Sequence, residues 1–162
     1  MIVVTANVFS ATLTVAPERT FPYGGVRFDY PRHYTFEADP TSPGLKIWTL
    51  SGNNFKIMYF VADETLTVDV FLASMMQQVD PNGGPIDAEP VTIALGGQSL
   101  LGKRAKMTLA GQAFYTDAYL LPGQATGSRL LVLQDALTDA GGGSAEAATA
   151  IELLASTFAI QP

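Results

Sequence analysis

Short glycine-rich spacers separate four segments of alternating polarity in the second half of the chain, and they restrict the fold more than any other feature. The segments span 89–95, 103–109, 113–121 and 129–133. Spacers such as Gly96-Gly97 are too short for the crossover of a dozen or more residues that parallel neighbours need. The sequence therefore predicts an antiparallel meander joined by tight turns.

A further hairpin is predicted in the first half of the chain. Residues 45–50 and 55–61 flank Ser51-Gly52-Asn53-Asn54, a polar cluster typical of a tight turn because Gly and Asn tolerate positive φ angles. Upstream, apolar and charged residues alternate over 26–30, which predicts a half-buried strand. The alternation resumes at Tyr34, in the expected partner of that strand.

Two stretches have helical periodicity. Apolar residues recur at helical spacing over 68–79, with Thr67 or Thr65 as the N-cap, and again over 145–159, with Ser144 as the N-cap. The order of elements predicts an α+β fold: a single twisted, mainly antiparallel sheet with two principal helices packed on it.

The length fits one domain that spans residues 1–162. We expect an N-terminal strand segment over 1–20, whose β-branched part is 3–15, before an α+β core over 21–160. The first eighteen residues contain no Lys or Arg and do not resemble a signal peptide. We therefore expect a cytoplasmic protein if Met1 is native, and an exported one if a targeting segment was removed.

Charge and composition exclude several classes of function. The formal net charge of −6 and only nine Lys and Arg argue against a nucleic-acid partner. The absence of Cys removes disulfides, thiol nucleophiles and thiolate metal sites. No apolar run reaches the roughly 18 residues that a membrane span needs, so no membrane span is expected.

Residues 97–104 come close to a phosphate-binding P-loop but lack its essential parts. Arg104 occupies the position where Mg²⁺ needs a hydroxyl, and a strand rather than a helix is predicted to follow. Ser99, in the same stretch, lacks the second glycine of a nucleophile elbow. A glycine-rich turn is the better interpretation.

No metal or cofactor site is predicted, and no catalytic residue is identified. His33 is the only histidine, so it cannot form a multi-histidine metal site, and we interpret it as a partly exposed turn residue. The acidic loop that begins at Asp80 places Pro85 and Val91 where an EF-hand needs Gly and a bidentate Glu.

The order of elements resembles a known group of proteins. The features are Phe28-Asp29-Tyr30-Pro31, the hairpin around Trp48, the Met-containing helix, the glycine-punctuated meander and the closing helix. Over residues 21–158 these resemble the Mog1/PsbP-like group, including the DUF1795/DcrB-type bacterial proteins. Members of that group are mostly accessory, chaperone or binding proteins without shared catalytic residues, so the resemblance implies a binding role.

One strand of the first hairpin is apolar on both faces. Ile57, Tyr59 and Val61 alternate with Met58 and Phe60. Either a helix covers each face, or one face is an open apolar patch of the kind that marks a binding site.

The candidate binding surface consists of Trp48, Tyr59, Met75 and Met76. The leading hypothesis is a non-catalytic binding or accessory protein that holds a protein segment or a hydrophobic ligand in an apolar groove between sheet and helix. One alternative is a small hydrolase or lyase that uses carboxylates and Tyr residues assembled by the fold. Its signature would be two carboxylates, or His33 with a carboxylate, converging in a pocket. Another is a structural subunit that forms homo-oligomers through an edge strand at 3–15.

Overall fold

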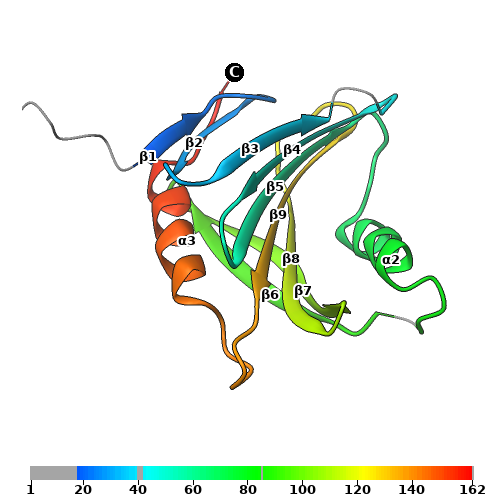
Figure 1. The fold of residues 1–162 in the computed structure, drawn as a ribbon. Coiled ribbons are helices and arrows are strands. Elements are labelled where there is room, and N and C mark those ends of the chain that lie inside the picture. Colours follow the sequence, from blue (N-terminus) through cyan, green and yellow to red (C-terminus); the bar gives the residue numbers. More distant parts are fainter. Residues whose placement is uncertain (1–17, 40–41, 85, 162) are drawn as a thin grey trace, which may run out of the picture.

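The computed structural model describes residues 18–39, 42–84 and 86–161. Within these residues, ten strands form two antiparallel sheets, and two helices pack against them (Figure 1). The predicted α+β class, with a mainly antiparallel sheet and two principal helices, is confirmed. The expected sheet is joined by a second, smaller one.

The larger sheet has seven strands in the order β3-β4-β5-β9-β8-β7-β6. The predicted hairpin is β4–β5 and the predicted meander is β6–β9, and β5 pairs with β9 to join them. The strands are β3 (Thr35–Asp39), β4 (Leu45–Ser51), β5 (Phe55–Ala62), β6 (Ala88–Leu95), β7 (Gln98–Leu109), β8 (Gln112–Leu120) and β9 (Ser128–Ala136).

Strand β7 begins at Gln98, five residues earlier than the sequence pattern predicts. The turn that precedes it needs only Gly96 and Gly97, whose φ angles are +56° and +83°. These left-handed conformations favour glycine because it has no Cβ. Most of the stretch that is similar to a P-loop is therefore extended strand, and Ser99 is a strand residue paired with Ala94.

The smaller sheet contains β1 (Glu18–Phe21), β2 (Val26–Pro31) and β10 (Ala159–Ile160), in the order β1-β2-β10. The expected pairing of β2 with the strand after Tyr34 is wrong. The backbone N–H of Tyr34 donates to the Pro31 carbonyl at 3.1 Å, and this turn leads the chain away from β2 to the edge of the larger sheet. The strand expected over 3–15 lies outside the described residues.

The helices are α2 (Val68–Val79) and α3 (Ala145–Thr157). Thr67 Oγ1 accepts a hydrogen bond from the Val70 N–H at 3.2 Å, and Ser144 Oγ accepts one from the Ala147 N–H at 3.1 Å, which confirms both N-caps. The C-terminal helix ends two residues earlier than predicted because Ala159–Ile160 pairs with β2. Among the described residues, no helix has both the length and the hydropathy needed to cross a lipid bilayer.

The two helices lie on opposite sides of the larger sheet (Figure 1). We call these sides the α2 face and the α3 face. On the α3 face, α3 and the smaller sheet cover a continuous aromatic and aliphatic core that includes Tyr59 and Leu154. On the α2 face, a smaller cluster forms around Phe60, Phe71 and Met107.

Candidate functional site

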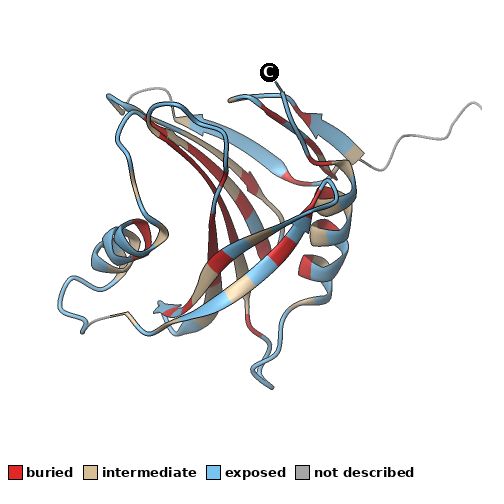
Figure 2. Cartoon of the chain, turned by 180° about the vertical axis from the view of Figure 1, so that it is seen from behind, coloured by how far each residue is buried: buried red, intermediate tan, exposed pale blue. Residues whose placement is uncertain are grey.

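Helix α2 covers its face of the sheet loosely. Only Phe71 and Leu72 of this helix are buried, and most of its surface is exposed (Figure 2). The helix lies against β7 and β8. The segment that leads into it is fixed by Ser128, whose hydroxyl accepts from the Leu66 N–H at 2.7 Å and donates to the Glu64 carbonyl at 2.9 Å. This anchor holds α2 over the sheet from one end.

A cavity of about 540 Å³ lies between α2 and the β4–β5 hairpin, and we call it the α2 groove. Its lining is mostly apolar, with a few polar side chains. From the sheet come Leu45, Ile47, Met58 and Phe60; from α2 and the segment before it come Glu64, Leu66, Val70, Phe71, Ser74, Met75 and Gln78.

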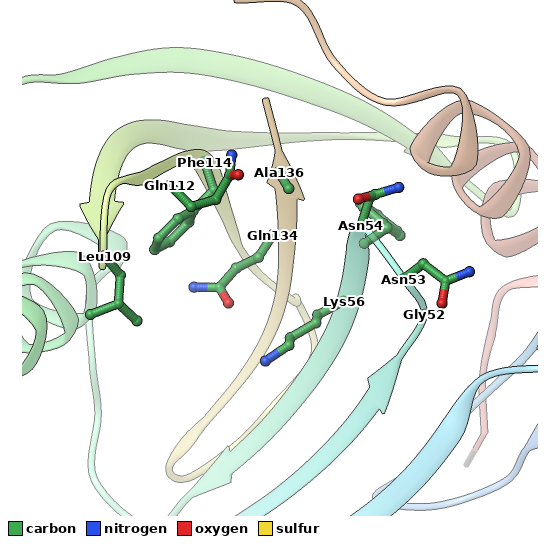
Figure 3. A pocket seen from close by; sticks show the side chains of 10 residues that line it. Gly52, Asn53, Asn54, Lys56, Leu109, Gln112, Phe114, Gln134 and Ala136 are labelled. Atoms are coloured by element: carbon green, nitrogen blue, oxygen red, sulfur yellow. The ribbon is translucent and has the colours of Figure 1, made fainter. Parts of the chain in front are cut away.

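A second, smaller cavity of about 240 Å³ lies near the β4–β5 turn, and we call it the polar pocket. Figure 3 shows Lys56 and Gln134 next to each other, extending away from their strands into the same space. The two residues are direct cross-strand partners. Around them the pocket is lined by Gly52, Asn53, Asn54, Phe55, Leu109, Gln112, Phe114 and Ala136.

The structure does not bring the four candidate residues together. Met75 lines the α2 groove, and Met76 packs in the same cluster on the α2 face. Trp48 and Tyr59 belong to the core on the α3 face. Successive strand residues point to opposite faces, so Met58, rather than its neighbour Tyr59, lies on the side of α2.

Tyr59 is a structural residue of the aromatic core. Its side chain is 1% exposed, its ring lies 5.7 Å from that of Trp48, and its hydroxyl donates to the Gly24 carbonyl at 2.7 Å. Burial raises the pKa of Tyr59 to about 12, against the opposing effect of the Arg129 guanidinium. At neutral pH the phenol is therefore a fixed donor.

His33 does meet a carboxylate, because its Nε2 lies 3.6 Å from Glu146 Oε1. However, that carboxylate already accepts hydrogen bonds from the backbone N–H groups of Asn53 and Asn54, at 2.9 and 2.7 Å. Burial works against ionisation, but the hydrogen bonds to this carboxylate, led by those from the backbone of Asn54 and Asn53, together outweigh it and lower the pKa of Glu146. The charged side chain fastens the first turn of α3 to the β4–β5 turn.

A second carboxylate near the start of α3 is also engaged. Asp135 accepts hydrogen bonds from the backbone N–H and the hydroxyl of Ser144, the latter at 2.6 Å. Within residues 18–39, 42–84 and 86–161, no group of three or more His, Asp or Glu could hold a metal ion. These contacts give the carboxylates structural roles at the ends of elements.

Comparisons with known proteins give fold likenesses only. No protein-family model matches the chain, and no curated protein matches it significantly in sequence. A protein from Bacteroides thetaiotaomicron is 16% identical with a TM-score of 0.46; the match covers 91% of this chain, which spans half (50%) of that protein.

Two further structures are similar at lower TM-scores. PA94 of Pseudomonas aeruginosa is 9% identical with a TM-score of 0.34, over 78% of this chain and 86% of its own. LpqN of Mycobacterium tuberculosis, involved in cell envelope biogenesis, is 13% identical with a TM-score of 0.34, over 92% of this chain and 81% of its own. The role of the site is therefore inferred from the residues of this chain.

Four residues of the α2 face had no place in the candidate surface derived from the sequence: Met58, Phe60, Lys56 and Gln134. For the first two a signal existed, because β5 is apolar on both faces. For Lys56 and Gln134 the signal is weaker: Lys56 is the polar end of an otherwise apolar row on β5, and Gln134 follows two apolar residues, Leu130 and Val132, in its row on β9.

Proposed function

We propose that this protein is a non-catalytic binding protein that holds an elongated hydrophobic ligand in the α2 groove. The observation that supports this most directly is the groove itself, an apolar cavity of about 540 Å³ between a sheet and a loosely covering helix. Ligand pockets in proteins typically measure about 300–1,000 Å³ and combine an apolar lining with a few polar groups. The α2 groove has both properties.

The kinds of side chain in the groove also suit an adaptable binding site. Met58 lines it from the sheet and Met75 lines it from the helix. Methionine is flexible and polarisable, so a cavity that it lines can adjust to ligands of different shape. A binding role agrees with the resemblance to the Mog1/PsbP-like group, which remains part of this proposal.

Fluorescence titration with Nile red, a neutral apolar dye, tests the proposal. We expect saturable binding at one site per chain. The substitution Val70→Trp should abolish binding, because Val70 lines the groove and is 56% exposed, so a larger ring can enter the cavity without disturbing the core. Circular dichroism would establish that the variant is folded.

The matched control is Ile160→Trp, which places the same ring at an exposed position in the smaller sheet, on the opposite side of the molecule. This variant should bind Nile red like the wild type. Absence of saturable binding to the wild type, or undiminished binding to a folded Val70→Trp variant, would overturn the proposal.

A further inference from the structure

The α2 groove and the polar pocket lie on one continuous face of the larger sheet. On β5, Lys56, Met58 and Phe60 alternate with the residues of the α3 core and therefore point to the α2 side. Their partners on β9 are Gln134, Val132 and Leu130. From Lys56 to Phe60 the strand rises by about 13 Å. Along that length the surface changes from polar to apolar.

The polar end of this face carries a cation, Lys56, that forms no ion pair with the residues that the structure describes. Its neighbour Gln134 donates through Nε2 to Thr116 Oγ1 at 3.2 Å. That bond orients the amide and leaves its second N–H free to donate. Lys56 and Gln134 can thus both donate to one acceptor.

The opposite end of the face carries the opposite charge. Among the described residues that line the two cavities, Lys56 is the only cation and Glu64 is the only carboxylate. Glu64 lies at the groove, where it disfavours a negative group. A single cation next to the apolar part of this face suits a ligand with a single negative charge. The two charges therefore orient such a ligand, with its negative group at Lys56 and its apolar part near Glu64.

The geometry points to a single-chain anionic amphiphile, an alkyl carboxylate, as the ligand. Its hydrocarbon chain lies in the α2 groove over Met58 and Phe60, and its carboxylate accepts hydrogen bonds from Lys56 Nζ and Gln134 Nε2. This inference rests on the proposed function, because it names the class of ligand that the groove holds.

Displacement of Nile red by dodecanoate, below its micelle-forming concentration, tests the inference. We expect dodecanoate to displace the dye, and dodecanol and dodecylammonium to do so only at higher concentration. Lys56→Gln should weaken dodecanoate binding about tenfold, the effect of losing one hydrogen bond to a charged group, and should leave dodecanol unaffected. Shorter carboxylates should bind about fourfold more weakly per methylene removed.

Lys46→Gln is the matched control, because it removes the same charge from β4 on the opposite face of the sheet. It should leave dodecanoate binding unchanged. Equal binding of dodecanoate and dodecanol by the wild type, or an equal effect of the two lysine substitutions, would overturn the inference. In that case, saturable Nile red binding would still support the proposed function. Failure of Nile red itself to bind would instead remove the proposed function.

Discussion

The two faces of the seven-stranded sheet are covered in different ways. The α3 face is packed by a helix and a second sheet, and most of its large side chains are almost inaccessible, among them Phe28, Tyr59 and Leu154. The α2 face is covered by one helix with two buried residues, and it contains a cavity of about 540 Å³. Both faces use the same β5 strand.

This difference separates stability from binding. Close packing maximises dispersion and hydrophobic stabilisation, and protein interiors normally leave few voids larger than a water molecule. A face that leaves a large apolar void forgoes that stabilisation. We infer that the α3 face holds the domain together and the α2 face is free to bind a ligand.

The largest expected effect is a contrast between two alanine substitutions. Tyr59→Ala should lower the free energy of unfolding by about 3–5 kcal/mol, because it leaves a cavity in the packed core. Met75→Ala, in the partly open groove, should cost only about 1 kcal/mol. Urea denaturation would measure both. Equal losses would mean that the two faces are equally well packed.

A smaller effect concerns the contact that ties α3 to the β4–β5 turn. Glu146→Gln should lower stability at neutral pH by about 1–2 kcal/mol, because the charged acceptor of two backbone N–H groups is lost. The pKa of Glu146 is lower in the folded protein than its ordinary value of 4.5. Its stabilisation is therefore complete above 4.5 and disappears as the pH falls through the folded pKa.

Urea denaturation of both proteins over a pH series would check this prediction. The difference in stability between wild type and Glu146→Gln should vanish in acid, where the wild-type carboxyl is protonated too. Glu152→Gln is the matched control, because Glu152 is an exposed carboxylate on the same helix. A pH-independent difference, or an equal one for Glu152→Gln, would contradict the role assigned to Glu146.

The smallest expected effect is local and concerns the helix over the groove. Thr67→Ala removes the N-cap of α2 and should destabilise the helix by about 0.5–1 kcal/mol. Amides of α2 should then exchange with solvent about two- to fivefold faster. Native-state hydrogen exchange would detect this. The matched cap variant on α3, Ser144→Ala, should leave α2 exchange unchanged, and an acceleration there would show that the two helices open together.

The elements and their caps could be predicted from the sequence because their signals are local. Thr67 and Ser144 are N-caps in the structure, and the 68–79 helix has the predicted limits. The antiparallel order of β6–β9 follows from short spacers. The pairing of β2 with β10 could not be predicted, because it joins segments about 130 residues apart and no local sequence pattern indicates such a contact.

The candidate site was only partly predictable, for a reason that β5 makes clear. Its alternation shows two apolar faces, but it does not show which face a helix fills and which it leaves partly open. Tyr59 and Met75 were grouped because both are large and apolar. In the fold they lie on opposite sides of the sheet. This depends on the segment 63–67, which connects β5 to α2 and so decides on which face of the sheet the helix packs.

The pairing of Ala159–Ile160 with β2 also determines when the protein can finish folding. Phe158, just before β10, stacks on Phe28 with ring centroids 6.3 Å apart, so residues near both ends of the described chain complete the same core. During synthesis, Phe28 therefore lacks its stacking partner until residues 145–161 have left the ribosome. We expect the smaller sheet and its packing against α3 to form only after that segment emerges.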